Sequence, residues 1–143
     1  MATYVLFLTL RKQTTLTIGA RGSHTLAADD YLYVGSAKRN WQHRVGRHLI
    51  KEGKTLRWHI DYILAEKECS IRNIMINMMN IECQTARKLI GQQRSLPPIP
   101  RIGSSDCRCP AHFLQLNAPR EKIEFLLIAD GFMNMKDQLK HDN

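Results

Sequence analysis

The chain has 143 residues, enough for one domain with a buried core, and its 43% hydrophobic and 24% charged residues are typical of globular proteins. Its 21 lysine and arginine residues against 13 aspartate and glutamate residues give a formal net charge of +8, which favours a polyanionic partner. No stretch is long enough to span a membrane, and the apolar N-terminus lacks the basic leader and small-residue cleavage site of a signal peptide.

The first part of the chain predicts β-structure. Residues 3–10 form a nearly continuous apolar run, typical of a strand covered on both faces. The β-branched residues 14–18 predict a second strand that pairs with the first as a hairpin. Residues 19–30 contain glycine, serine and aspartate and predict a loop, and residues 31–34 predict a third strand that Gly35 and Ser36 break.

Helices and shorter strands are predicted in the rest of the chain. The first helix spans residues 40–51, with Trp41, Val45, His48 and Leu49 on one stripe and Gly53 as its C-terminal cap. Further helices are predicted at residues 59–65, 81–90 and 119–129, and further strands at residues 74–78 and 112–116.

This order of elements predicts an α+β fold, with a small, mainly antiparallel β-sheet flanked by helices. The strand-then-helix order does not suit a doubly wound parallel sheet. We expect one domain at residues 1–131 and a polar C-terminal tail at residues 132–143.

The junction between the predicted strand at 31–34 and the helix after it is the most informative segment. Phenol, guanidinium and imidazole groups would gather there, as phosphodiester chemistry requires. Residues 38–57 also hold seven basic residues and only one acidic residue. Charge gathered beside a turn and along one helix attracts polyanions, although a solvated, solubilising surface is the competing interpretation.

Three motifs in this chain resemble the GIY-YIG nuclease family, and most closely its small Uri-type branch. They are Tyr-Val-Gly-Ser-Ala at 33–37, Trp-His-Ile-Asp-Tyr at 58–62 and Gly-Ser-Ser-Asp-Cys at 103–107, in that order. The first signature tripeptide is degenerate and reads Ala-Thr-Tyr at 2–4. The resemblance extends from Thr3 to about Leu116. It implies a metal-dependent endonuclease that hydrolyses phosphodiester bonds in DNA, with a role in DNA repair.

The resemblance also implies catalytic roles. Tyr4 and Tyr33 match the two signature tyrosines, and Arg44 and His48 match the family's arginine and histidine on the first helix. Tyr33 could take a proton from water if nearby cations lowered its pKa well below about 10. Arg44 offers a planar donor fork for phosphate oxygens. The competing interpretation is that the tyrosines are sheet aromatics and His48 a core histidine.

Glu82 matches the family's metal-binding glutamate. Mg²⁺, or Mn²⁺ in its place, suits such a site because Mg²⁺ keeps most of its waters and needs only one or two protein carboxylates. Asp61 and Asp106 are the alternative metal ligands.

We expect the nucleic acid to be DNA rather than RNA and to be bound through its phosphates. The residues expected to contact it are Lys38, Arg39, Arg47, Lys51, Arg57, His59 and Ser105.

Four cysteines in a chain without a visible secretory signal favour a reducing, cytoplasmic compartment and free or metal-bound thiols. Cys107, Cys109 and His112, with Cys83 as a fourth ligand, have residue types suited to zinc. Their spacing is not that of a standard zinc finger, and buried cysteines beside a strand are the favoured interpretation.

Two other functional classes remain open at this stage. One is a non-catalytic nucleic-acid-binding module that keeps the fold and the basic surface but has lost turnover. The other is a small adaptor stabilised by zinc. Protein partners, the substrate's structure and the pathway do not follow from the sequence.

Overall fold

Six antiparallel strands form one sheet across residues 1–104 and 107–136, which are the residues that the computed structural model describes. The order of the strands across the sheet is β6-β7-β4-β1-β5-β8. Their bounds are β1 Ala2–Leu10, β4 Asp29–Ala37, β5 Cys69–Asn77, β6 Ser95–Leu96, β7 Phe113–Leu116 and β8 Met133–Asn134. The predicted α+β fold with an antiparallel sheet is confirmed.

Strand β1 lies at the centre of the sheet and pairs with β4 on one side and β5 on the other. Nearly all its residues are buried, which is why its sequence is a continuous apolar run rather than an alternation. Successive side chains point to opposite faces. Tyr4 and Leu6 therefore join one hydrophobic cluster, and Val5 and Phe7 join the other.

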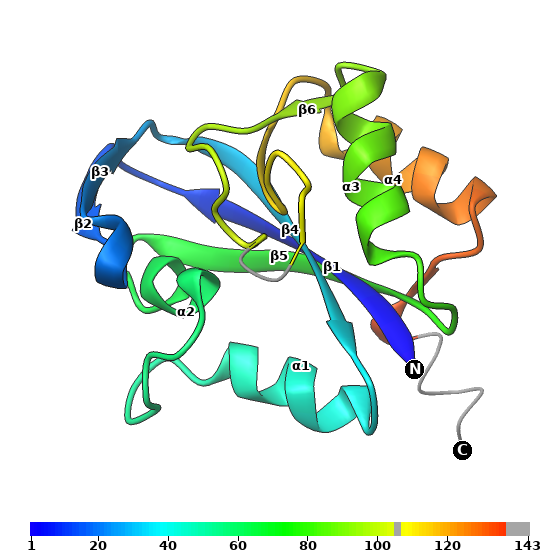
Figure 1. The fold of residues 1–143 in the computed structure, drawn as a ribbon, viewed down its shortest axis with the longest axis horizontal. Helices are drawn as coiled ribbons and strands as arrows, with labels where there is room; N and C mark the ends of the chain where they lie inside the picture. The colour runs from blue at the N-terminus through cyan, green and yellow to red at the C-terminus, as the bar shows by residue number, and fades with distance from the viewer. Residues whose placement is uncertain (105–106, 137–143) are drawn as a thin grey trace.

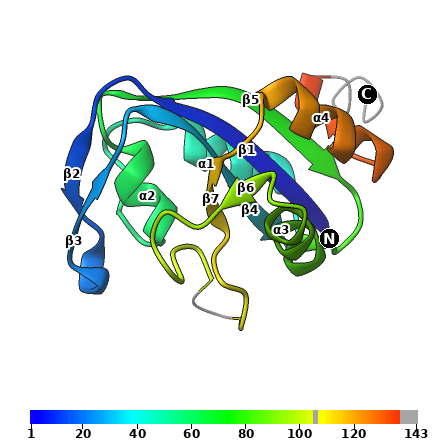
Figure 2. The same ribbon diagram turned by 90° about the horizontal axis from the view of Figure 1, so that it is seen from above.

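Helices cover both faces of the sheet (Figure 1, Figure 2). Helices α1 (Trp41–Leu49) and α2 (His59–Leu64) pack on the face that Tyr4 occupies. Helices α3 (Glu82–Gly91) and α4 (Arg120–Ala129) pack on the opposite face. Within the described residues, no helix is long and apolar enough to cross a membrane.

The predicted hairpin between the first two strands is wrong. Strand β2 (Thr14–Thr17) pairs with β3 (Ser23–Leu26) around a short 3-10 helix, η1 (Gly19–Arg21), and forms a separate two-stranded sheet. The segment predicted as a loop thus contains a strand. Figure 2 shows this hairpin at the end of the molecule opposite α3.

The predicted break at Gly35 is also wrong, because β4 continues through Gly35 and Ser36 to Ala37. Tyr4 pairs with Gly35 in the neighbouring strand, and its ring lies against the Gly35 backbone. A Cβ atom at Gly35 would lie 2.4 Å from Cζ of Tyr4. The glycine is therefore a contact surface for an aromatic ring and not the end of a strand.

Helix α1 is shorter than predicted. Asn40 caps its start in the left-handed conformation, with φ of 45°, and its side chain accepts a hydrogen bond from the His43 backbone N–H. The helix ends at Leu49, so Gly53 is not its cap but lies in the following bend. Leu49 is 51% exposed, and the buried stripe of the helix ends at His48.

The later helices and β7 lie close to their predicted bounds, whereas β5 begins at Cys69 rather than at residue 74 and β6 was not predicted. Helix α2 buries Ile60, Ile63 and Leu64 as predicted, and Pro119 stands directly before α4. One difference concerns the C-terminal segment, where β8 pairs with β5 and extends the sheet past residue 131.

Candidate active site

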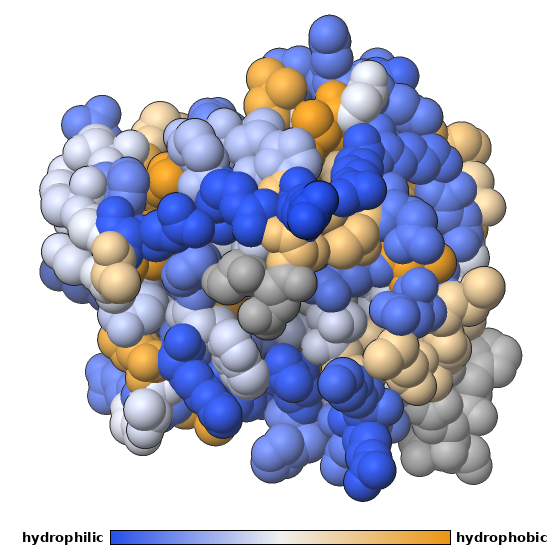
Figure 3. All heavy atoms as spheres, in the orientation of Figure 1, coloured by the Kyte–Doolittle hydropathy of each residue, from blue (hydrophilic) through white to orange (hydrophobic). Residues whose placement is uncertain are grey.

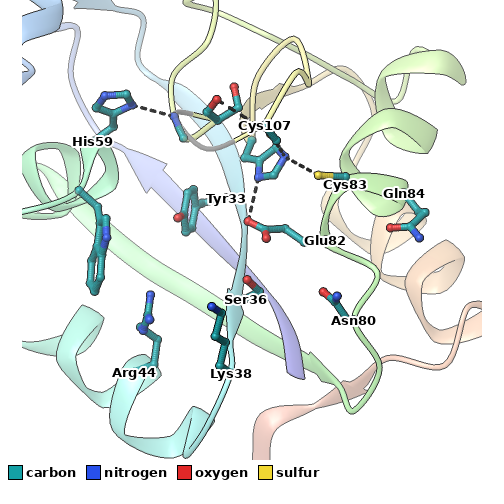
Figure 4. A pocket seen from close by; sticks show the side chains of 14 residues that line it. Tyr33, Ser36, Lys38, Arg44, His59, Asn80, Glu82, Cys83, Gln84 and Cys107 are labelled. Carbon is teal, nitrogen blue, oxygen red and sulfur yellow. Dashed lines mark hydrogen bonds and ion pairs between the residues drawn. The ribbon is translucent and has the colours of Figure 1, made fainter. Parts of the chain in front are cut away.

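A pocket of about 620 Å³ opens beside the C-terminal half of β4 (Figure 4). Its wall combines residues from β4, α1, the start of α2, the start of α3 and the connector before β7. These residues are Tyr33, Ser36, Lys38, Arg44, Trp58, His59, Asn80, Glu82, Cys83, Gln84, Gly103, Ser104, Cys107 and His112.

The antiparallel register brings the two signature tyrosines together. Tyr4 is opposite Gly35, and Tyr33 is two residues before Gly35, so both rings project from the same face of the sheet. Their ring centroids are 6.2 Å apart. Tyr33 lines the pocket, whereas Tyr4 is 1% exposed and its hydroxyl lies within hydrogen-bonding reach of His48 and of the pocket residue Arg44.

Tyr4 is linked to His48 of α1, since its hydroxyl lies 2.7 Å from Nε2 of the imidazole. Burial lowers the pKa of His48 to about 4 despite the nearby Asp61 carboxylate, so the ring is neutral at neutral pH. Nδ1 of His48 lies 4.0 Å from Oδ1 of Asp61 and has no hydrogen-bond partner among the described residues. With the ring proton on Nδ1, toward Asp61, Nε2 accepts the hydroxyl proton of Tyr4.

The expectation that nearby cations lower the pKa of Tyr33 is wrong. Burial raises the pKa of both Tyr4 and Tyr33 well above the ordinary value, and the positive charge of Arg44 only partly opposes this. The cause is desolvation, which penalises a phenolate more than the neighbouring guanidinium stabilises it. Both tyrosines are therefore neutral hydrogen-bonding groups at neutral pH.

Two arginines of α1 contact Trp58 and differ in what else they bind. The Cζ atoms of Arg44 and Arg47 each lie 4.4 Å from the centroid of the Trp58 ring. Arg44 lines the pocket and points into it (Figure 4). Arg47 instead forms a two-pronged ion pair with Asp61, with Nη1–Oδ1 and Nη2–Oδ2 distances of 2.9 and 3.1 Å.

Asp61 is a structural carboxylate. Its side chain is fully buried and also accepts hydrogen bonds from the backbone N–H groups of Arg57 and Trp58, at 2.8 Å each. Burial alone would raise the pKa of Asp61, but these hydrogen bonds and the one from Arg47 lower it. Since its lone pairs are occupied by protein donors, Asp61 is unsuited to the metal site for which it was an alternative.

The basic residues expected to bind nucleic acid fall into two groups in the structure, those bound to protein groups and those that are exposed. The ammonium group of Lys51 donates hydrogen bonds to the backbone carbonyls of residues 64, 66 and 69, and so holds the end of α2 against β5. Like Arg47, it is committed to protein partners. Lys38, Arg39 and Arg57 are exposed, and Lys38 lines the pocket.

The remaining predicted nucleic-acid contacts are His59 and Ser105, and Asp106 is the second alternative metal ligand. Nδ1 of His59 accepts a hydrogen bond of 3.0 Å from the backbone N–H of Gly103, so His59 fixes the connector to α2. Ser105 and Asp106 lie outside the described residues. The face of the molecule in the orientation of Figure 1 is largely hydrophilic, with hydrophobic residues in small separate patches (Figure 3).

Glu82, the first residue of α3, lies across the pocket in the direction of Tyr33 (Figure 4). Its Oε1 atom is 3.0 Å from Nδ1 of His112. Burial alone would raise the pKa of Glu82, but hydrogen bonds from His112 and Ser36 and the charge of Arg44 lower it. Glu82 is therefore an ionised carboxylate in a polar pocket, and it could hold a hard divalent cation.

A sulfur-rich cluster forms the wall of the pocket next to Glu82. The ligand atoms of Cys83, Cys107, Cys109 and His112 all lie within 4.8 Å of one another. Cys83 comes from α3, and the other three residues come from the connector before β7. The spacing of these four residues along the sequence disfavours a metal site. Spacing does not reveal that α3 lies beside the connector and so brings Cys83 close to the other three residues.

Sequence reasoning did not assign pocket roles to Ser36, Trp58 and Asn80. Ser36 and Trp58 belong to two of the three motifs, at 33–37 and 58–62, so the motifs contained a signal for both. Asn80 lies between β5 and α3, and no pattern in the sequence marks it.

Comparison with known families gives one match. The model of the family described as "Domain of unknown function DUF123" matches residues 3–131. No curated protein and no solved structure matches the chain. The matched residues include both tyrosines, Arg44, Glu82 and the sulfur-rich cluster.

Proposed function

The chain belongs to this family of unknown function, and we propose that it is a divalent-metal-dependent endonuclease that hydrolyses phosphodiester bonds in DNA, of the GIY-YIG type that its sequence resembles. One observation carries the proposal. An ionised carboxylate, Glu82, and the guanidinium of Arg44 line one polar pocket next to a tyrosine–histidine hydrogen bond. These are the groups that phosphodiester hydrolysis needs, namely a cation ligand, a phosphate ligand and a proton acceptor.

Glu82 holds the metal in this proposal. A single ionised carboxylate suits Mg²⁺ or Mn²⁺, which keep several waters and complete their shell with phosphate oxygens of the substrate. When bound, such an ion supplies Lewis-acid stabilisation of the charge that develops on the phosphate and the leaving oxygen. His112 and Ser36 hold the carboxylate ionised and oriented toward the pocket.

Arg44 binds the phosphate. The Trp58 ring supports one face of its guanidinium, which limits the orientations of the side chain, and the edge of the guanidinium presents N–H donors to the Tyr4 hydroxyl and to oxygen atoms in the pocket. A phosphate on Arg44 also lies close to the Tyr4 hydroxyl, because Arg44 is near enough to that hydroxyl to influence its pKa. The attacking water is thereby brought toward the tyrosine pair.

Tyr4 and His48 receive the proton from the attacking water. A phenol with a raised pKa is a poor base by itself, but the Tyr4 hydroxyl already donates to Nε2 of a neutral imidazole. In this proposal Tyr4 passes its own proton to His48 as it takes one from a water that reaches its hydroxyl beside Arg44, which lines the pocket. The Asp61 carboxylate, 4.0 Å from Nδ1, stabilises the resulting imidazolium. Tyr33 orients the water or a phosphate oxygen at the pocket surface.

A cleavage assay tests the proposal. Supercoiled plasmid and labelled oligonucleotides, both duplex and branched, are incubated with the protein in Mg²⁺, in Mn²⁺ and in chelator. We expect metal-dependent cleavage that falls by at least about 100-fold in Glu82→Gln. Glu121→Gln is the matched control, since Glu121 is an exposed acid in the first turn of α4. Unchanged activity in Glu82→Gln, or no cleavage of any substrate with either metal, contradicts the proposal.

A nucleic-acid-binding module without turnover is the second candidate. The deep burial of both tyrosines favours it, because neither phenol ionises near neutral pH. In this case the protein binds DNA in a salt-dependent manner and leaves it intact under every metal condition.

A further inference from the structure

We propose that Cys83, Cys107, Cys109 and His112 bind one structural zinc ion in the wall of the pocket. Their three sulfur atoms and one imidazole nitrogen all lie within 4.8 Å of one another. Nε2 of His112 is 3.5 Å from Sγ of Cys107 and 3.8 Å from Sγ of Cys83. In tetrahedral coordination, with zinc–sulfur and zinc–nitrogen distances of about 2.3 and 2.0 Å, neighbouring ligand atoms lie roughly 3.5–3.8 Å apart. The two distances from Nε2 are close to the edges of such a tetrahedron, and no two ligand atoms of the cluster are more than 4.8 Å apart.

The donor types select the ion and its role. Three thiolates and an imidazole are soft and borderline ligands that suit zinc better than magnesium or calcium. Four protein ligands fill a tetrahedral shell and leave no position for water, which is the arrangement of structural zinc sites rather than catalytic ones. This ion would therefore differ in kind and in role from the hard cation that we assign to Glu82.

The remaining contacts of His112 agree with a metal on Nε2. Its other nitrogen, Nδ1, lies 3.0 Å from Oε1 of Glu82. A zinc ion on Nε2 requires the ring proton on Nδ1, and that N–H then donates to the carboxylate. A ligand histidine that donates its second N–H to a carboxylate is the usual outer-shell partnership of protein zinc sites. Both nitrogens of the buried imidazole would therefore have a partner, the zinc ion on Nε2 and the Glu82 carboxylate on Nδ1.

The zinc ion would also explain how a long connector keeps its shape. No regular secondary structure occurs between β6 and β7 in the described residues 97–104 and 107–112. Connectors of this length inside a domain usually need some other source of order. The Arg101 guanidinium binds the carbonyl oxygens of Cys107 and Cys109, the latter at 2.7 Å. A metal shared with Cys83 would tie the same residues to α3.

The zinc ion would act on Glu82 through His112. By fixing the Nδ1 proton and the orientation of the imidazole, it would hold Oε1 of Glu82 toward the pocket. The consequence for catalysis rests on the function proposed above, whereas the existence of the site does not. The two are therefore tested by different measurements.

Metal content tests the site directly. The full chain, purified without chelator, should contain one zinc per chain by elemental analysis. After exchange with Co²⁺ it should show the absorption of tetrahedral cobalt together with thiolate-to-metal charge-transfer bands. Protein that contains no zinc and binds neither Zn²⁺ nor Co²⁺ at micromolar concentration, or a disulfide among these cysteines in protein kept under reducing conditions, overturns the proposal.

A matched pair of cysteine variants locates the site. Cys107→Ser should lose most of the zinc, and Cys69→Ser should keep it, since Cys69 is buried in β5 away from the cluster. Cys83→Ser is the second variant, for the case that Cys107→Ser does not fold. Equal zinc content in all three variants contradicts the assignment.

A fourth variant tests the link to Glu82. Glu82→Gln should keep the zinc but weaken its affinity by about 10-fold or more, as loss of an outer-shell carboxylate usually does. An unchanged zinc affinity would show that the carboxylate does not support the site. A chain that holds zinc but cleaves no substrate would refute the nuclease and leave the zinc site standing.

Discussion

Tyr4 can occupy its position only because residue 35 has no side chain. The ring of Tyr4 is buried and fills the space where a Cβ atom at Gly35 would lie. The tyrosine–histidine hydrogen bond of the candidate site therefore depends on one glycine of the neighbouring strand.

We predict that Gly35→Ala destabilises the protein by about 3 kcal/mol, because an extra methyl group in a packed core forces its neighbours to shift. Gly46→Ala, in α1, is the control: no heavy atom lies within 4 Å of its added Cβ, and alanine favours helix, so stability should be unchanged or slightly higher. Urea unfolding measures the free energy of unfolding of both variants. An equal effect in the two variants would show that Tyr4 does not occupy this space.

His48 should make the stability of the protein depend on pH. Its pKa is about 4 when folded and about 6.5 when unfolded, so the unfolded chain binds a proton more readily. The stabilisation is complete above pH ~6.5 and is lost as the pH falls toward 4. Each pKa unit corresponds to about 1.4 kcal/mol, so the full loss is on the order of 3 kcal/mol.

Unfolding of the wild-type protein by urea between pH 4 and 7 should show this loss. In His48→Asn the decline should be smaller, whatever the starting stability of the variant. His43→Asn, on the exposed side of the same helix, should decline like the wild-type protein. If the free energy of unfolding fell equally with pH in all three proteins, His48 would not be buried in its neutral form.

Arg44 and Arg47 should respond in opposite ways to replacement by alanine. Arg44→Ala should leave the fold intact and, if the proposed function holds, reduce turnover far more than DNA affinity. Arg47→Ala removes the closest ion-pair partner of the buried Asp61 carboxylate, leaving Lys54 Nζ at 3.9 Å, and should destabilise the protein by about 3 kcal/mol. Thermal unfolding measures the loss of stability expected of Arg47→Ala, and cleavage assays measure the loss of turnover expected of Arg44→Ala. A stable Arg47→Ala variant would contradict the role assigned to the ion pair.

The basic residues around α1 should bind nucleic acid through its phosphates. The sequence suggested Arg47 and Lys51 for this role, but both are bound to protein groups. We therefore expect the exposed residues Lys38 and Arg39 to carry more of the salt dependence. DNA affinity should fall steeply with salt, and each alanine variant should reduce the slope of log Kd against log salt by about 1.

Lys51→Ala serves as the control for this measurement. It should lower stability, since three backbone carbonyls lose their donor, but it should leave the salt slope unchanged. A slope near zero in the wild-type protein would contradict phosphate binding altogether.

The elements that sequence reasoning predicted best are those whose pattern depends on burial alone. The apolar run of residues 3–10 predicted β1, because a central strand needs apolar residues on both faces. Strand partners were harder to predict, since β2 has the composition of a strand whichever neighbour it pairs with. Gly35 was misread because a glycine that ends a strand and one that accommodates a ring look identical in sequence.

For the candidate site too, some features could be predicted from the sequence and others could not. Tyr33, Arg44 and Glu82 lie in one pocket as the motifs implied. The protonation states could not be predicted, because burial outweighs the cations whose influence the sequence suggested. The spacing of the cysteines could not predict that Cys83 lies beside Cys107, since the packing of α3 brings them together.

Both helical layers contribute residues to the pocket. Arg44 comes from the layer of α1 and α2, and Glu82 comes from the layer of α3 and α4. Strand β4 separates these layers and supplies Tyr33 to the pocket. The geometry of the pocket therefore depends on how both layers pack against one sheet.

The central place of β1 has a further consequence for the order in which the protein can fold. Strand β1 leaves the ribosome before its partners and completes its pairing only when β5, which ends at Asn77, has followed it. At a synthesis rate of about 5–20 residues per second, an apolar strand waits for several seconds without its second partner. Because these pairings join distant parts of the chain, refolding should be slow for a domain of this size, in milliseconds to seconds. During synthesis, this N-terminal strand is the segment that a chaperone would need to protect.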